Sequence, residues 1–171
     1  MKKSVIYSVV ACLGFIAVAL FIWTTYRNFP LVGELIIALP TENQRQITRL
    51  GPEPRVRITS TNQAILESPV YFDIRVLPWF HTANIEMVFQ ENGQTLDGIA
   101  LQSAAGWNYN LKKPDTIEAL ADGWSKATFI FNLAGGYQVR NVRRFLLSTR
   151  HSDPSVRGEM LIQSLHVTLR W

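Results

Sequence analysis

The fold of this chain is decided by residues 70–93, which read VYFDIRVLPWFHTANIEMVFQENG. From Val70 to Val76 every second residue is aliphatic or Phe, and the residues between them are Tyr, Asp and Arg. The alternation returns from Ala83 to Gln90, before the turn residues Glu91-Asn92-Gly93. A period of two residues is typical of a β-strand that buries one face. The stretch therefore predicts two consecutive strands facing one core.

The same alternation recurs along the rest of the chain. It predicts further strands at residues 33–39, 55–59, 98–102, 107–111, 127–133, 142–148 and 165–170, and the polar stretch 40–54 predicts a long loop. One short helix is expected at 115–123, because Asp115 resembles an N-cap and Glu118 follows it at the capping-box spacing. Many short strands without alternating long helices favour an all-β antiparallel sandwich. We expect a jelly-roll-like sandwich in preference to an immunoglobulin-like one, because the cysteine pair of antibody domains is absent, although other immunoglobulin-like folds lack that pair too. If residues 33–39 pair with the last strand, the anchor enters the sandwich almost directly.

The N-terminal segment has a different pattern. Lys2 and Lys3 are followed by an uncharged, mainly apolar run from Val5 to Trp23, and the next charge is Arg27. At about 1.5 Å per residue this run makes a helix of roughly 28 Å, close to the thickness of a bilayer core. The sequence therefore predicts a single-pass transmembrane helix that acts as a signal anchor in the cell membrane.

The lysines at the start predict the orientation of this anchor. Positive residues favour the cytoplasmic side, so we expect a cytoplasmic N-terminus and an extracytoplasmic remainder. Trp23 and Tyr26 stand where interfacial aromatic residues usually lie. We expect residues 1–30 to form the cytoplasmic tip, anchor and juxtamembrane segment, and residues 31–171 to form the sandwich domain.

Two alternatives to a retained anchor remain open. Ala17-Val18-Ala19 offers small residues for a signal peptidase, although the apolar run continues beyond them. Val9-Val10-Ala11-Cys12 resembles a lipobox ending in an acylated cysteine, although apolar residues follow it where a polar tether is expected. Otherwise Cys12 is a small apolar residue of the helix.

Composition limits the partners of the sandwich. The chain has 17 basic and 13 acidic residues. Without the two anchor lysines, 15 basic residues remain, so the sandwich is nearly neutral and nucleic acid is not an expected partner. Arg140, Arg143 and Arg144 are candidate contacts for an anionic envelope polymer or lipid headgroup, or else the solvated face of a strand pair. The one cysteine lies in the anchor, so the sandwich has no internal disulfide.

A search for catalytic chemistry finds few candidates. His81, His151 and His166 are scattered without metal-binding spacing, and no nucleophile or phosphate-binding motif is present. Asp73 and Glu86, on adjacent predicted strands, are the one carboxylate pair of interest for a glycosidase. The ordinary alternative is that they pair with Arg75 or are other solvated charges on an exposed sheet face. We expect no enzyme activity.

Metal and cofactor binding is not expected either. Asp97, Asp122 and Asp153 stand in predicted turns, where carboxylates can hold calcium, but they do not form a recognised calcium loop. The sequence assigns no metal and no cofactor.

Aromatic and amide residues in three predicted turns are the strongest candidates for ligand binding. They are Trp79, Phe80 and His81 in the first turn, Trp107 and Tyr109 in the second, and Tyr137 and Gln138 in the third. Aromatic faces stack on the apolar faces of sugar rings, and amides pair with hydroxyl groups. The alternative for each ring is packing in the core.

The C-terminal third resembles the closing strands of carbohydrate-binding-module-like and galactose-binding-like jelly rolls. The resemblance lies in residues 124–131, 144–148 and 158–167, which look like a tryptophan-led strand, an apolar middle strand and a final strand after a glycine turn. Many such modules carry an Asp-Asn or Asp-Asp pair in the last strand, where this chain has Gln163-Ser164. The resemblance therefore implies a jelly roll, without the calcium-linked or sugar-contacting role of that pair.

Together these patterns predict a membrane-anchored extracytoplasmic β-sandwich that binds a glycan or cell-envelope polymer without catalysis. The alternative is a structural or assembly subunit of an envelope complex, whose exposed sheet face or edge strand contacts protein partners.

Overall fold

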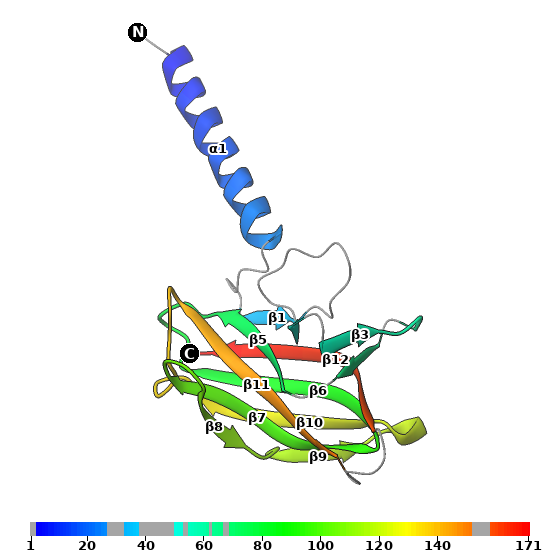
Figure 1. The fold of residues 1–171 in the computed structure, drawn as a ribbon. Coiled ribbons are helices and arrows are strands. Elements are labelled where there is room, and N and C mark those ends of the chain that lie inside the picture. The colour runs from blue at the N-terminus through cyan, green and yellow to red at the C-terminus, as the bar shows by residue number, and fades with distance from the viewer. Residues whose placement is uncertain are drawn as a thin grey trace.

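The computed structural model describes residues 3–26, 33–37, 50–52, 55–61, 63–66, 69–151 and 158–171. These residues form one long helix, α1 (Lys3–Tyr26), and two antiparallel sheets that pack face to face (Figure 1). The predicted all-β antiparallel sandwich, preceded by one apolar helix, is confirmed.

The larger sheet has seven strands in the described part of the chain. Its order is β3 (Val56–Ile58), β4 (Ala64–Leu66), β12 (Glu159–Arg170), β6 (Thr82–Asn92), β10 (Ser125–Asn132) and β9 (Thr116–Ala119), with β1 (Glu34–Ile36) also paired to β12. Leu35 lies opposite Val167 in the β1–β12 ladder. The first strand therefore pairs with the last.

The smaller sheet has five strands among the residues that the structure describes. Its order is β2 (Leu50–Gly51), β5 (Val70–Arg75), β11 (Val142–His151), β7 (Gln94–Ala104) and β8 (Asn108–Lys112). The sequence missed β2, β4 and β9, because two to four residues are too few to establish an alternation. Residues 38 and 39 of the predicted strand 33–39, residues 40–49, 53 and 54 of the predicted loop 40–54, and the expected domain boundary at residue 30 lie outside the described residues.

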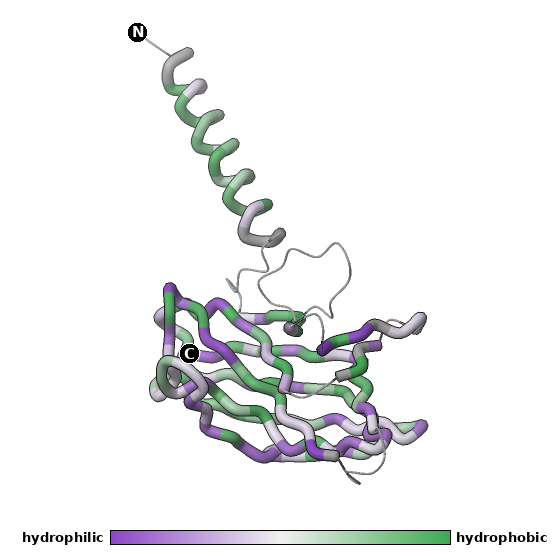
Figure 2. Tube along the Cα trace, viewed as in Figure 1, coloured by the Kyte–Doolittle hydropathy of each residue, from purple (hydrophilic) through white to green (hydrophobic). Residues whose placement is uncertain are grey.

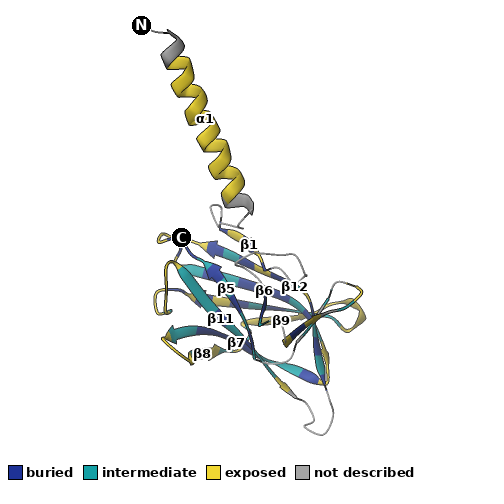
Figure 3. Ribbon diagram, turned by 45° about the horizontal axis from the view of Figure 1, so that its top comes forward, coloured by how far each residue is buried: buried dark blue, intermediate teal, exposed yellow. Residues whose placement is uncertain are grey.

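The core lies between the two sheets and is built from the inward-facing alternate residues of each strand. Phe72 and Phe145 are opposite each other in the β5–β11 ladder, and their rings stack with centroids 5.3 Å apart. The ring of Phe131 from the other sheet meets Phe145 edge-on at 5.2 Å. All three side chains are buried, so this aromatic cluster joins the two layers. Figure 3 shows the buried residues recurring along the strands.

The helix predicted at 115–123 is wrong. Residues 116–119 form β9, and only Ala121–Gly123 form one 3-10 turn, η2. The Asp115 carboxylate accepts a hydrogen bond from the backbone N–H of Ile130 (2.7 Å) instead of capping a helix, and Glu118 forms an ion pair with Lys126 across the β9–β10 ladder (3.1 Å). Pairing with β10 therefore overrides the local capping pattern.

The chain changes from one sheet to the other at a corner made by two glycines. Gly93, with φ of 82°, joins β6 to β7, and Gly158 stands immediately before β12. A Cβ atom on Gly93 would lie 2.7 Å from the Cα of Gly158. The buried side chain of Gln94 fixes the corner, because its Nε2 donates to the Gly158 carbonyl (3.0 Å) and its Oε1 accepts from Thr149 (2.7 Å).

Helix α1 has the composition of a membrane span. Its segment from Ile6 to Trp23 is long and apolar enough to cross a bilayer, and none of it is buried against the protein. Figure 2 shows the apolar colouring along α1, in contrast to the mixed colouring of the strands. Cys12 is exposed within this helix.

Asp97 links three segments at the outer surface of the smaller sheet. Its Oδ1 accepts hydrogen bonds from Nζ of Lys113 (2.6 Å) and Nη2 of Arg150 (2.7 Å). The hydrogen bond from Lys113, with the charge of Arg150, lowers the pKa of Asp97 below its ordinary value of 3.8. The ionised carboxylate is therefore favoured more in the folded chain than in the unfolded chain.

We expect this carboxylate to stabilise the fold above pH 3.8 and to lose that contribution as the pH falls through its lower folded pKa. Urea unfolding midpoints measured from neutral pH to pH 2 should therefore fall less in Asp97→Asn than in the wild type. Parallel curves for the two proteins would contradict this expectation.

Candidate functional site

The two outer faces of the sandwich differ in chemistry. The outward residues of the larger sheet include Glu86, Lys126 and His166, a pattern of solvated charges. The smaller sheet instead presents aromatic, aliphatic and paired charged side chains together. Its outward residues are Tyr71 and Asp73 on β5, Val142, Arg144 and Leu146 on β11, Gln102 on β7, and Tyr109 and Leu111 on β8.

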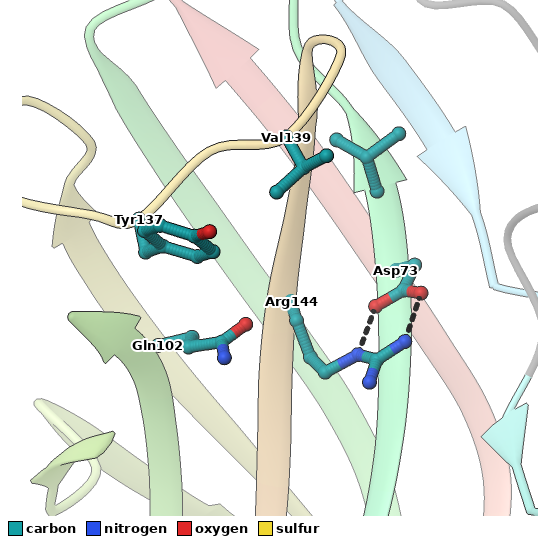
Figure 4. A pocket seen from close by; sticks show the side chains of 6 residues that line it. Asp73, Gln102, Tyr137, Val139 and Arg144 are labelled. Atoms are coloured by element: carbon teal, nitrogen blue, oxygen red, sulfur yellow. Dashed lines mark hydrogen bonds and ion pairs between the residues drawn. The ribbon is translucent and has the colours of Figure 1, made fainter. Parts of the chain in front are cut away.

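Strand register brings the polar members of this face into one row. Asp73 is opposite Arg144 in the β5–β11 ladder, and Gln102 is opposite Tyr109 in the β7–β8 ladder. Nε and Nη2 of Arg144 donate to the two carboxylate oxygens of Asp73, each at 2.7 Å (Figure 4). The Arg144 guanidinium also lies 4.2 Å from the ring centroid of Tyr71. The row is thus fixed by a bidentate ion pair beside an aromatic ring.

A hollow of about 250 Å³ opens on this row. It is lined by Asp73, Gln102, Tyr137, Val139, Val142 and Arg144. Figure 4 shows Tyr137 and Val139 on the loop between β10 and β11, above the sheet residues. The hollow therefore has a polar floor and an aromatic and aliphatic wall.

Two local structures hold the loop that forms this wall. The backbone N–H of Tyr137 donates to the Gln102 carbonyl (2.7 Å). Val139 and Val142 exchange backbone hydrogen bonds around Arg140 and Asn141, which have φ of 50° and 64°. Two consecutive positive φ values are typical of a type I′ hairpin turn. The wall is thus tied both to β7 and to the start of β11.

Gly136 is the point where this loop packs most closely on the sandwich. A Cβ atom there would lie 2.6 Å from Nη1 of Arg143 and 2.8 Å from Cδ2 of Leu101. Nη1 of Arg143 donates to the Gly136 carbonyl, and burial lowers the pKa of Arg143. Arg143 therefore braces the loop from inside the sandwich.

The ionisation states in the hollow follow from these contacts. The hydrogen bond to Asp73 raises the pKa of Arg144, so the guanidinium keeps its charge. Burial raises the pKa of Tyr109 despite the opposing charge of Arg144, so the phenol keeps its proton. Nε2 of Gln102 donates to the Gly106 carbonyl (2.7 Å), which leaves its amide oxygen as an acceptor for a ligand. The site thus offers donors and acceptors around a neutralised ion pair.

Of the residues predicted to bind a ligand, three belong to this region. Tyr137 lines the hollow, and Tyr109 stands beside Gln102 at its edge. Trp107 is 75% exposed, with its ring centroid 6.0 Å from that of Tyr109. Gln138 is next to Tyr137, but its Nε2 donates to Oδ1 of Asn141 (2.7 Å), which stabilises the hairpin turn.

The first predicted turn forms a separate cluster. The Trp79 ring stacks on Trp171 at 6.2 Å and contacts Phe80 at 6.0 Å. Phe80 is only 4% exposed, so its ring packs in the core and is not available to a ligand. His81 is exposed, and its backbone joins the ends of β12 and β10.

The three arginines predicted to contact an anion do not form one patch. Arg144 is neutralised by Asp73, and Arg143 is directed to the Gly136 carbonyl. Arg140 is exposed at the tip of the hairpin turn, away from these two contacts. Anion binding by the three arginines as a group stays a prediction that this arrangement does not favour.

The predicted proximity of Asp73 and Glu86 is wrong. The strands that carry them are consecutive in sequence but belong to different sheets, and both side chains face outward. They therefore lie on opposite faces of the sandwich and cannot flank one glycosidic bond. Asp73 instead forms an ion pair with Arg144 on the same sheet face.

Sequence reasoning missed Gln102, Val139 and Val142 as lining residues. The available signal was the outward-facing position of Gln102 and Val142 at the ends of predicted strands, and the place of Val139 after the turn at Gly135-Gly136. In the part of the chain that the structure describes, no three metal-ligating side chains converge. Asp153 lies outside the described residues.

The fold and this hollow define an antiparallel β-sandwich with a polar and aromatic depression on its smaller sheet. No protein-family model matches the chain. No curated protein matches it either.

Solved structures that are similar to this chain include two carbohydrate-binding modules. One is a CBM4 module, with 12% identity over 67% of this chain and 78% of that chain and a TM-score of 0.40. Another is the C-terminal CBM6 of a laminarinase from Zobellia galactanivorans, with 14% identity over 79% of this chain and 98% of that chain and a TM-score of 0.40.

A third similar structure is a family GH115 4-O-methyl-alpha-glucuronidase with specificity for decorated arabinogalactans. It is 9% identical over 77% of this chain and 18% of that chain, with a TM-score of 0.40. Carbohydrate-binding modules, which the C-terminal third resembles, are thus among the similar structures. The assignment of the fold rests on the two antiparallel sheets themselves, and the assignment of the site rests on its geometry.

Proposed function

We propose that this chain is a membrane-anchored, extracytoplasmic module that binds a glycan without catalysis, through the hollow on its smaller sheet. The observation that carries the proposal is the hollow itself, where an ion pair and an amide form the floor and Tyr137 and Val139 form the wall. Sugar rings present the matching chemistry, with hydroxyl groups at the edge and apolar C–H faces.

The neutral net charge of the floor limits which glycans fit the hollow. Asp73 and Arg144 neutralise each other, and each carboxylate oxygen of Asp73 retains a lone pair that can accept from a hydroxyl group. A neutral, hydroxyl-rich glycan fits this floor better than a polyanion, because a free anion would compete with Asp73 for the same guanidinium. The volume of about 250 Å³ suits one ring, with neighbouring rings passing over Tyr109 and Trp107.

The location in this proposal is supported by α1. Its apolar length and the lysines before it favour a retained anchor with the sandwich on the extracytoplasmic side. Polymers of the cell envelope would then be the accessible glycans.

Replacement of Tyr137 by alanine is expected to weaken glycan retention by about tenfold, because it removes the aromatic wall. The full chain in nanodiscs, applied to a glycan array, provides the measurement. Ile130→Ala is the matched control, since this exposed side chain lies on the other sheet. Equal retention by the wild type and Tyr137→Ala would remove the hollow from the proposal.

A protein-binding role is the second candidate, and β9 is the observation that favours it. β9 ends the order of the larger sheet within the described residues, and its Ile117 is 61% exposed. An exposed edge strand with apolar residues is suited to strand addition by a partner. Loss of a co-purifying protein in Ile117→Lys, with no glycan retained by the wild type, would favour this role.

A further inference from the structure

We propose that a second surface of the sandwich rests in the interfacial layer of the bilayer that α1 crosses. This surface, the aromatic corner, consists of the exposed rings of Trp79 and Trp171, which pack on the buried ring of Phe80. The inference rests on the part of the proposed function that makes α1 an anchor, and it is independent of glycan binding.

In the aromatic corner, two exposed indole rings pack on a buried phenylalanine ring. The Trp79 and Trp171 rings stack with centroids 6.2 Å apart and an interplanar angle of 20°. Phe80 lies beneath them, 6.0 Å from Trp79 and 5.8 Å from Trp171, and is buried. Trp79 is 41% exposed and Trp171 is 80% exposed. The exposed surface is therefore a pair of large amphipathic rings held by a core residue.

Backbone hydrogen bonds hold the corner in place. The N–H of His81 donates to the Arg170 carbonyl (2.9 Å), and the N–H of Leu133 donates to the His81 carbonyl (2.8 Å). The turn that carries Trp79 is thus fixed to the end of β12, immediately before Trp171, and to the end of β10. The backbone of the corner is already ordered, so binding of the rings to a surface costs little conformational entropy.

The chain enters the sandwich directly against this corner. The Gly33 carbonyl accepts from the N–H of Leu169, and a Cβ atom on Gly33 would lie 3.2 Å from Cε1 of Phe80. α1 ends at Tyr26, and seven residue steps of up to about 3.6 Å span at most about 25 Å. Whatever path the connection takes, the anchor keeps this end of the sandwich close to the bilayer.

The chemistry of the corner identifies the lipid interface as its partner. Indole rings favour the interfacial layer, because the ring is apolar and its N–H can donate to headgroups or water. The exposed charges beside the corner, Glu34 and Arg170, are opposite in sign. Attraction to anionic lipid therefore contributes little, and we expect the contact to persist in zwitterionic vesicles and at high salt.

The test uses tryptophan fluorescence of the full chain in phosphatidylcholine vesicles that contain lipids brominated near the interface. A Trp23→Phe background removes the tryptophan of α1, which would be quenched in every variant. We expect the remaining quenching to fall by more than about half in Trp79→Phe/Trp171→Phe and to stay unchanged in Trp107→Phe, the matched exposed control. Phenylalanine keeps an aromatic ring at each position, and melting curves verify the fold.

Other results would separate the inference from the anchor and from glycan binding. Equal quenching in the double variant and its background would overturn the inference. Loss of retention on the glycan array in the double variant, with quenching unchanged, would overturn it too and assign the indoles to the glycan. Failure of the wild type to float with vesicles would refute the anchor and the inference together, whereas normal quenching without any glycan retention would support the inference and refute glycan binding alone.

Discussion

Replacement of Arg144 by alanine is expected to weaken glycan binding by at least about tenfold while the sandwich stays folded. The substitution removes the guanidinium that orients Asp73 in the floor of the hollow and leaves the carboxylate without its bidentate partner. A charge-assisted group in a binding site contributes about 1.5–3 kcal/mol, which is tenfold or more in affinity. The measurement is the dissociation constant of the full chain in nanodiscs for a glycan that it retains on the array.

Stability should change little in this variant. The Arg144 side chain is 39% exposed, and pairs of this kind contribute at most about 1 kcal/mol to folding. A double-mutant cycle with Asp73→Ala separates the two residues, because a second substitution should cost little affinity once the pair is already broken. Wild-type affinity in Arg144→Ala, or additive losses in the cycle, would show that the ion pair does not form the floor of a binding site.

Replacement of Phe145 by alanine is expected to lower the free energy of unfolding by about 3–5 kcal/mol, the largest single effect on stability that we expect. Phe145 is fully buried, stacks on Phe72 within its own sheet and meets Phe131 from the opposite sheet. A cavity at this position removes contacts of both layers at once. Thermal and urea unfolding of the full chain in detergent should show a melting temperature lower by about 10 °C or more.

Phe145→Leu is the control for this effect. Leucine keeps most of the buried apolar volume and should cost less than half as much as alanine. A loss under about 1 kcal/mol in Phe145→Ala would mean that the two sheets are not joined through this cluster.

Much of the fold was predictable, because a strand that buries one face alternates apolar and polar residues along its own sequence. The alternation in residues 70–76 and 83–90 predicted β5 and β6, and the apolar run after Lys3 predicted α1. These features depend only on residues close together in the sequence, so the spacing of apolar residues is enough to predict them.

The candidate site was predictable only in part. Tyr109, Tyr137 and Arg144 were selected because their residue types suit contact with a ligand or an anion. The structure places Tyr137 and Arg144 in the lining of one hollow and Tyr109 opposite the lining residue Gln102. Phe80 was indistinguishable from Trp79 in sequence, yet one ring is buried and the other is exposed. The difference arises because Gly33 and Trp171, from distant parts of the chain, cover Phe80.

By itself the sequence determined the apolar helix, the strands long enough to show alternation, and the face that each of these strands buries. Only the tertiary structure decided which strands share a sheet. β5 and β6 are consecutive yet lie in different layers, so Asp73 is separated from Glu86 and meets Arg144, 71 residues away. The physical reason is that the alternation of residues along a strand decides which side chains face the core. The strand that becomes its hydrogen-bonded neighbour is decided by packing between distant segments of the chain. For the same reason, pairing with β10 makes residues 116–119 the strand β9, although the capping pattern at Asp115 favoured a helix.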